Sequence, residues 1–244
     1  MNSFPQAAAN LVELRSLLRE RFPQAHREEV SPTGGSESAP EPGWESGVAC
    51  LDGLGLEPGH VIEVVRSEPG CAAGHAAGSG LVIHRLLQGA ANRGRHVALV
   101  DGCDAFDPES ACHNTCASLL WVRCRRVTEA VKAADFLLRD GNLPLVLLDL
   151  QLSELRELRR VPSSSWYRLK SLAQKVGAFF FAFTPGKLIR SADLRLAPST
   201  RYDLDSLETP RRELGEALRV EVLRRKGSAR RGEGGSVEGL RRVG

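Results

Sequence analysis

Leu145–Leu150, with the sequence LVLLDL, is the stretch that decides the fold class. It is apolar throughout except for Asp149, so it predicts a strand that is buried on both faces. Such strands are typical of a parallel sheet covered by helices on both sides. Similar runs occur at His96–Asp101 (HVALVD) and Ala178–Thr184 (AFFFAFT). We therefore expect an α/β fold with a mostly parallel sheet.

The segments around these runs support the same class. Further strands are predicted at Val61–Val65 and Leu119–Val122. Amphipathic spacing and capping residues predict helices at three places, namely Ser79–Asn92, Glu129–Arg139 and from Ser163 to Val176. Beyond Ala192 the pattern changes to alternation of apolar and polar residues, at Leu194, Leu196 and Ala217–Leu223. This later part is predicted to form partly exposed strands at the sheet edge.

Composition divides the chain into four parts. Residues 1–30 are expected to form an N-terminal helix, 31–47 a flexible linker rich in Pro, Gly and Ser, 48–225 the core domain, and 226–244 a basic disordered tail. The apolar stripe of the first helix, which includes Leu14, Leu17 and Leu18, either docks on the core or binds another protein. Both interpretations remain open at this stage.

Charge and cysteine content exclude some classes of protein. The net charge is only +3, which by itself does not indicate nucleic-acid binding. No apolar run reaches the roughly 18 residues that a membrane span requires, and the first ten residues do not resemble a signal peptide. We expect a cytoplasmic protein with free thiols. A zinc site among Cys103, Cys112 and the neighbouring Cys and His residues is disfavoured because the ligands do not form two close pairs, so no metal site is predicted.

A glycine-rich turn follows the first predicted strand of the core. Residues 66–80 read RSEPGCAAGHAAGSG, and five of these fifteen residues are Gly or Pro. A turn of this kind at the start of a helix can hold phosphate with its backbone N–H groups. The nucleotide-binding candidates are Gly70, Gly74, Gly78, Ser79 and Gly80. However, the turn has no Lys, which a working phosphate loop needs, so a loop that holds no phosphate is the favoured interpretation.

Acids stand where the predicted strands end. Asp149 ends its strand at the place expected for a Walker-B-type aspartate, which would hold the water ligands of Mg²⁺, although a simple turn-capping role is an equal alternative. Asp101 ends another strand and Asp104 follows closely. Because ligands of open α/β sheets bind at the carboxyl ends of the strands, these acids belong to the candidate site.

The order of these segments resembles that of RecA-type recombinases over about residues 46–185. The resemblance rests on LEPGHVIEVV (56–65), the glycine-rich turn, HVALVDGCDAFDP (96–108) and LPLVLLDL (143–150). RDGNLP (139–144), PSSSWYRL (162–169) and LIRSADLRL (188–196) look like the ImuA branch. The resemblance implies a RecA-like P-loop NTPase fold and a role in damage-induced mutagenesis. The implied partners are an ImuB-like Y-family polymerase homologue, a replicative-type error-prone polymerase and RecA itself.

The departures from the RecA pattern point away from catalysis. The lysine and threonine of the phosphate loop fall at about Gly78 and Ser79, and the water-activating glutamate falls at Cys103. The resemblance therefore implies a non-catalytic accessory protein without a resident cofactor, with ATP and Mg²⁺ as the doubtful alternative.

Two other functions stay open. One is a DNA-binding recombination mediator or residual ATPase, and the other is a SulA-like inhibitor of cell division. DNA or a partner could be contacted through basic residues near the C-terminus, of which the candidates are Arg224, Arg225, Lys226, Arg230 and Arg231.

Overall fold

The computed structural model describes residues 46, 48–66, 78–200, 202 and 205–226. The expected N-terminal helix with Leu14, Leu17 and Leu18, nearly all of the linker, Gly70, Gly74 and the tail with Arg230 and Arg231 lie outside the described residues. The described residues cover most of the predicted core domain.

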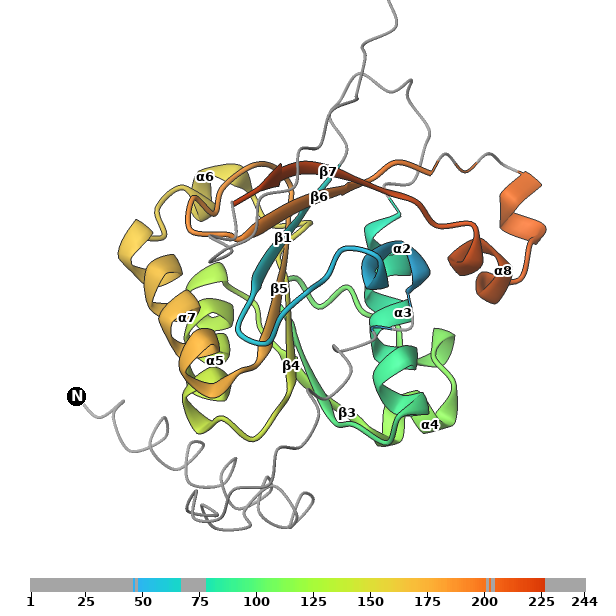
Figure 1. Ribbon diagram of the computed structural model, residues 1–244, viewed down its shortest axis with the longest axis horizontal. Coiled ribbons are helices and arrows are strands. Elements are labelled where there is room, and N and C mark those ends of the chain that lie inside the picture. Colours follow the sequence, from blue (N-terminus) through green and yellow to red (C-terminus); the bar gives the residue numbers. More distant parts are fainter. Residues whose placement is uncertain (1–45, 47, 67–77, 201, 203–204, 227–244) are drawn as a thin grey trace, which may run out of the picture.

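A seven-stranded sheet with the order β3-β2-β4-β5-β1-β6-β7 forms the centre of the fold (Figure 1). Its strands are β1 (Val61–Val65), β2 (Val97–Asp101), β3 (Leu119–Arg123), β4 (Leu145–Asp149), β5 (Phe179–Thr184), β6 (Leu194–Pro198) and β7 (Val220–Arg225). Every neighbouring pair is parallel except β6 and β7, which are antiparallel. Four strands, β1, β2, β4 and β5, are buried along nearly their whole length, as strands covered on both faces must be.

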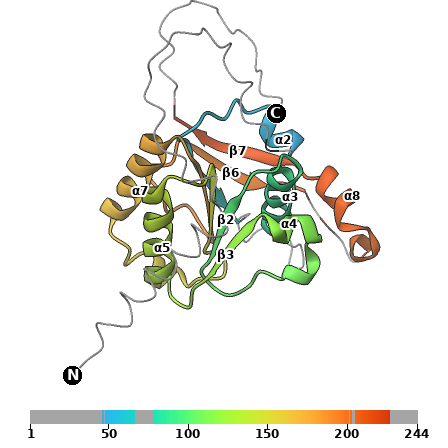
Figure 2. The same cartoon turned by 90° about the horizontal axis from the view of Figure 1, so that it is seen from below.

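Helices cover both faces of this sheet. The helices are α2 (Ala49–Asp52), α3 (Ser79–Asn92), α4 (His113–Ala117), α5 (Val127–Asp140), α6 (Leu155–Leu158), α7 (Ser163–Val176) and α8 (Arg211–Glu216). Helices α5 and α7 lie on one side of the sheet and α3 and α4 on the other (Figure 2). Each side has its own apolar core, because successive residues of a strand point to opposite faces. The expected α/β class, with a mostly parallel sheet and helices on both faces, is confirmed.

Two helices begin at places other than the sequence predicts, and α7 begins at Ser163 as predicted. Asp107 followed by Pro108 predicts a helix start with Asp107 as its N-cap. Asp107 does cap a helical segment, through a hydrogen bond from Glu109 N, but that segment is a 3₁₀ turn of three residues, and α4 begins only at His113. The sequence predicts Thr128 as the cap of α5, but this helix begins at Val127, whose N–H donates a hydrogen bond to Glu157 Oε1 and whose side chain is buried in the core. Pro162, whose fixed backbone suits the position, precedes α7, so the serines 163–165 form its first turn.

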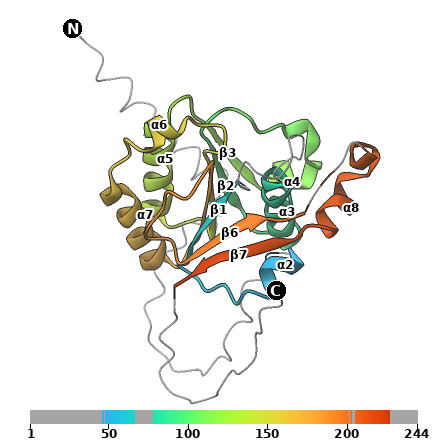
Figure 3. The ribbon, with the colours of Figure 1, turned by 90° about the horizontal axis from the view of Figure 1, so that it is seen from above.

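The C-terminal part adds the antiparallel edge of the sheet. Strands β6 and β7 run side by side there, and α8 lies beyond them (Figure 3). Arg224 and Arg225 belong to β7, and Lys226 N donates a hydrogen bond to Asp193 O at 2.8 Å. These three basic residues are therefore part of the ordered sheet edge, although their sequence context resembled that of the tail.

Candidate functional site

The carboxyl ends of β2 and β4 lie next to each other, since Asp101 and Asp149 are partners in the register of these strands. Gly102 N donates a hydrogen bond to Asp149 O at 2.8 Å. A Cβ atom on Gly102 would lie 2.5 Å from Leu150 Cδ2 and 2.8 Å from Asp149 O. The two strand ends are therefore in direct contact, with no space for another group between them at Gly102.

Asp101 is fully buried and holds the loop that follows β2. Its Oδ1 accepts hydrogen bonds from Cys103 N at 3.3 Å and Ala105 N at 3.0 Å. Its Oδ2 accepts from Phe106 N at 2.9 Å and from Trp121 Nε1 at 3.3 Å. A carboxylate has about four acceptor positions, so these four donors use the capacity of Asp101 within the protein itself.

Asp149 has fewer partners than Asp101. Its Oδ1 accepts from Gln151 N at 3.0 Å and from Gln151 Nε2 at 3.2 Å. Burial raises the pKa of Asp149 to about 6, and the nearby charge of Asp101 acts in the same direction. Asp149 thus lies where a Walker-B-type acid is expected, but its carboxyl group takes up a proton more readily than an ordinary aspartate.

Cys103 occupies the position at which the resemblance places a water-activating glutamate. Its Sγ lies 3.2 Å from Ser153 Oγ, so the thiol is engaged with the loop after β4. Burial raises the pKa of the Cys103 thiol, and the charges of Asp149 and Asp101 raise it further against the opposing hydrogen bond to Ser153. A neutral thiol with this partner is not suited to activate water.

Asp104 is paired with Arg123, the last residue of β3. Arg123 donates to both of its carboxylate oxygens, with Nε–Oδ1 at 2.5 Å and Nη2–Oδ2 at 2.6 Å. This hydrogen-bonded guanidinium lowers the pKa of Asp104, and it also lies 4.8 Å from the centre of the Trp121 ring. Asp104 therefore belongs to an exposed ion pair and is not brought together with Asp149.

The start of α3 is enclosed by the C-terminal part of the chain. Gly78 has φ +65°, and a Cβ atom there would lie 3.1 Å from Pro198 Cβ and 3.6 Å from both Leu218 Cδ1 and Tyr202 Cε2. Ser79 is 1% exposed, and its Oγ has no hydrogen-bonding partner among the described residues. Gly80 is exposed, with nothing within 4 Å of such an added atom. Gly78, in the position of the phosphate-loop Lys, thus lies beside Pro198, Leu218 and Tyr202, and Ser79, in the position of the Thr, is buried.

A buried polar network in the middle of the sheet was not predicted from sequence. Glu63 of β1 is fully buried, and its Oε2 accepts from Arg195 Nε of β6 at 2.6 Å. Its Oε1 accepts from Thr184 Oγ1 at 3.2 Å and from the backbone N–H groups of residues 188 and 189. The signal in the sequence was a single Glu within VIEVV and a single Arg between Leu194 and Leu196.

The basic candidates in the described part of the C-terminal region also have structural partners. Arg224 Nη2 donates to Arg190 O at 2.8 Å and to Ala192 O at 2.9 Å. Arg225 Nη2 donates to Leu54 O. Both side chains therefore tie β7 to the rest of the domain, and their assignment to a DNA or partner surface remains a prediction.

Two features are absent from the described residues. No group of three or more His, Cys, Asp or Glu side chains in this part of the chain is arranged to hold a metal ion. Within the same residues, no helix has the length and apolar character needed to cross a membrane.

Comparisons with known proteins find similarity to solved structures, and to no family model or curated protein. Among solved structures, the chain is similar to the crystal structure of the RadB recombinase, with 17% sequence identity and a TM-score of 0.47 over 62% of this chain and 81% of that chain. The fold assignment accordingly rests on the sheet and helices described above.

Proposed function

We propose that this chain is a non-catalytic RecA-like accessory protein of the DNA damage response, of the ImuA type. In this role it serves translesion synthesis by binding a Y-family polymerase homologue, together with a replicative-type error-prone polymerase. It acts through protein contacts, and hydrolysis of ATP is not part of its function.

The enclosed start of α3 is the observation that carries this proposal. A phosphate loop must present its Lys and hydroxyl side chains to the nucleotide. Here Gly78 has no side chain to present and packs near Pro198, Leu218 and Tyr202. Apolar side chains packed against this position favour a protein that does not bind phosphate there.

The acids at the strand ends support the same conclusion. The ATP and Mg²⁺ that a RecA-like fold implies would need a carboxylate to orient water and an ionised acid near the metal. Cys103 stands in the first position, and the pKa of about 6 of Asp149 disfavours the second role at mildly acidic pH. The four donors to Asp101 leave it no capacity for an added ligand. These residues do not fit ATP with Mg²⁺.

One observation favours residual nucleotide binding as a second candidate. Ser79 Oγ is buried without a hydrogen-bonding partner among the described residues, and such an atom costs free energy unless something binds it. A nucleotide phosphate would satisfy that atom without a bound Mg²⁺. The DNA-mediator and division-inhibitor alternatives have no comparable support in the described residues.

Affinity purification from DNA-damaged cells tests the proposed function. We expect the tagged full chain to recover a Y-family polymerase homologue and a replicative-type polymerase, in amounts that do not change when ATP is depleted from the lysate. Recovery of neither polymerase would contradict the proposal. Recovery of a tubulin-like division protein instead would favour the inhibitor.

Equilibrium binding of fluorescent ATP with millimolar Mg²⁺ separates the two candidates. The accessory role predicts no saturable binding, with the same result for Ser79→Ala. Saturable binding that Ser79→Ala weakens would establish the residual nucleotide site. Ser171→Ala is the matched control, because it removes a serine hydroxyl at an exposed position of α7, outside the candidate site.

A further inference from the structure

Helix α6 is fixed to the domain in spite of its short length. Leu158 is 2% exposed and packs in the core beneath α5 and α7. Glu157 Oε1 accepts a hydrogen bond from Val127 N at 3.1 Å, which ties α6 to the start of α5. Ahead of α6, the contact between Ser153 and Cys103 fixes the loop that leaves β4. The segment from β4 to α6 is thus attached at three points.

Two leucines of this fixed segment nevertheless face solvent. Leu152 is 67% exposed and Leu155 is 41% exposed. They are three residues apart: Leu152 lies within the turn in which Ser153 N donates to Leu150 O, and Leu155 is the first residue of α6. Since the anchors on both sides are made, the exposure does not come from a helix that has failed to dock. Apolar patches at the surface that are rimmed by polar residues mark protein contact sites, whereas single exposed apolar residues do not.

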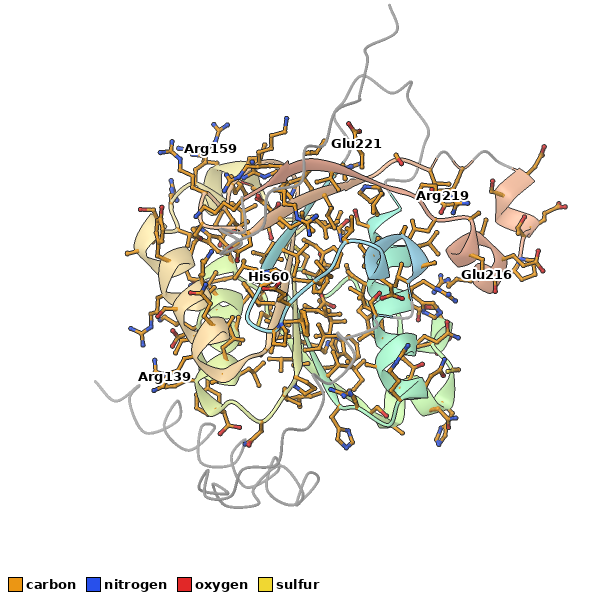
Figure 4. The ribbon with its side chains drawn as sticks, viewed as in Figure 1. His60, Arg139, Arg159, Glu216, Arg219 and Glu221 are labelled. Atoms are coloured by element: carbon orange, nitrogen blue, oxygen red, sulfur yellow. The ribbon has the colours of Figure 1, made fainter. Side chains whose placement is uncertain are left out.

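Exposed basic side chains follow the two leucines along the chain. Arg156, Arg159 and Arg160 follow in the same segment and are all exposed. Arg159 extends outward beside α6 in Figure 4. Leu155 Cδ2 lies 3.8 Å from the position that a Cβ atom on Gly186 would take. The exposed Lys187, next to Gly186, is therefore in the same region. Together we name Leu152, Leu155, Arg156, Arg159, Arg160 and Lys187 the leucine–arginine surface.

We propose that the leucine–arginine surface is the docking site for an acidic protein segment that carries aliphatic side chains. This proposal rests on the proposed function, because that function requires a protein partner. The aliphatic side chains of the segment cover Leu152 and Leu155, while its carboxylates pair with the arginines around them. Arginine clusters are well suited to acidic motifs because the guanidinium group binds carboxylates with two parallel hydrogen bonds.

A protein segment fits this surface better than a nucleic acid. Single strands are usually held by bases stacked on aromatic side chains within a basic groove. The segment 150–160, LQLSELRELRR, has no aromatic residue and contains two glutamates, of which Glu154 is exposed between the leucines. Exposed leucines contribute to binding by burial against other apolar groups. These features favour a partner that offers both carboxylates and apolar side chains.

Photocrosslinking in damaged cells tests the proposal. The full chain carries p-benzoylphenylalanine in place of Glu154, between the two intact leucines, and the crosslinked material is identified by mass spectrometry. A matched control carries the same group in place of Tyr167, which is 54% exposed on α7. We expect Glu154, but not Tyr167, to crosslink to an acidic, aliphatic protein segment.

Charge and apolar variants identify which side chains carry the contact. Arg156→Glu with Arg159→Glu is expected to lower the crosslink about tenfold, and Leu152→Ser with Leu155→Ser by a similar factor. The control, Lys132→Glu with Lys175→Glu, makes the same change of charge at exposed positions of α5 and α7 and is expected to leave the crosslink within about twofold. Thermal unfolding of each variant shows that the fold is kept.

The outcomes separate this proposal from the proposed function. An acidic, aliphatic segment of the polymerase homologue would support both, and such a segment of another protein, lost in both variants, would support the surface and contradict the function. Affinity recovery of the polymerase without a crosslink from position 154 would overturn the surface and leave the function intact. A crosslink to DNA, or one that the charge reversal does not weaken, would also overturn the surface.

Discussion

Glu63 and Asp149 are both acids on inner parallel strands, and their environments differ. Glu63 is held by Arg195, by the Thr184 hydroxyl and by two backbone N–H groups. Asp149 accepts hydrogen bonds only from Gln151 among the partners in the described residues, and burial raises its pKa to about 6. The first acid is part of the fold, whereas the second is kept at a cost to stability.

This difference separates structural acids from candidates for function. A buried carboxylate that is fully paired stabilises the strand arrangement around it. A buried carboxylate with few donors is what functional sites often contain, although such a group does not by itself prove function. Asp101 resembles Glu63 in this respect, so of Asp101 and Asp149, the two acids that end β2 and β4, Asp149 is the one with unused acceptor capacity among the described residues.

Removal of the Arg195 charge should have the largest effect on stability. Arg195→Met leaves Glu63 buried without its cationic partner, and we expect the free energy of unfolding to fall by about 3–5 kcal/mol in urea titrations. The double variant with Glu63→Gln should recover part of this loss, because the uncompensated charge is then gone. A loss below about 1 kcal/mol for Arg195→Met would mean that the network is not structural.

A methyl group at Gly102 should have the next largest effect. Gly102→Ala places Cβ 2.5 Å from Leu150 Cδ2 and 2.8 Å from the Asp149 carbonyl oxygen, so the ends of β2 and β4 must separate. We expect a loss of about 2–3 kcal/mol in the same measurement. Gly80→Ala, which meets nothing within 4 Å near the start of α3, should be neutral or stabilise by up to about 1 kcal/mol. Equal losses for both would contradict the close contact of the strand ends.

Neutralisation of Asp149 should change stability less, and it should raise the free energy of unfolding. Because its folded pKa is about 6 and its ordinary value is 3.8, the folded state binds more protons than the unfolded state between these values. The contribution of Asp149 to stability is therefore fully present below about pH 4 and is lost as the pH rises through about 6. Asp149→Asn should be about 1–2 kcal/mol more stable than the natural chain at pH 7.5 and similar to it near pH 4.

Urea titrations at several pH values check this expectation. Asp135→Asn is a suitable control, since Asp135 lies on α5 and pairs with Arg139 and Arg168 of the outer helices. A pH profile that Asp149→Asn leaves unchanged would show that the Asp149 carboxylate is better stabilised than its few hydrogen bonds indicate.

The sequence predicted the inner strands because their apolar runs are a local property. Val61–Val65 was predicted with the bounds that the structure has, as was α3 at Ser79–Asn92. Gly141 and Gly177 end their helices in the left-handed conformation, as expected of glycines in this position. The C-terminal strands were predicted less well, and α8 was not predicted at all, because short exposed elements depend on contacts with distant residues.

The sequence predicted where the site residues lie along the strands better than it predicted their contacts. The sequence indicated which acids end strands, because strand ends follow from local patterns. It could not indicate that the loop amides bind Asp101, that Ser153 contacts Cys103, or that Pro198 and Leu218 cover the start of α3. Each of these contacts joins segments far apart in the chain or depends on the path of a loop. The local spacing of residue types predicts neither kind of contact.

The place of β1 in the sheet has a consequence for how the chain folds during synthesis. Among the described strands β1 is the first in the sequence, yet its two neighbours in the sheet, β5 and β6, are made more than 100 residues later. The pairs β2–β3 and β2–β4 can form before then. During that time both edges of β1 are unpaired, and Glu63 lacks its partner Arg195. Contacts of such long sequence separation slow folding and prolong the exposure of apolar strands. The newly made chain therefore exposes the edges of β1 until β5 and β6 have been made.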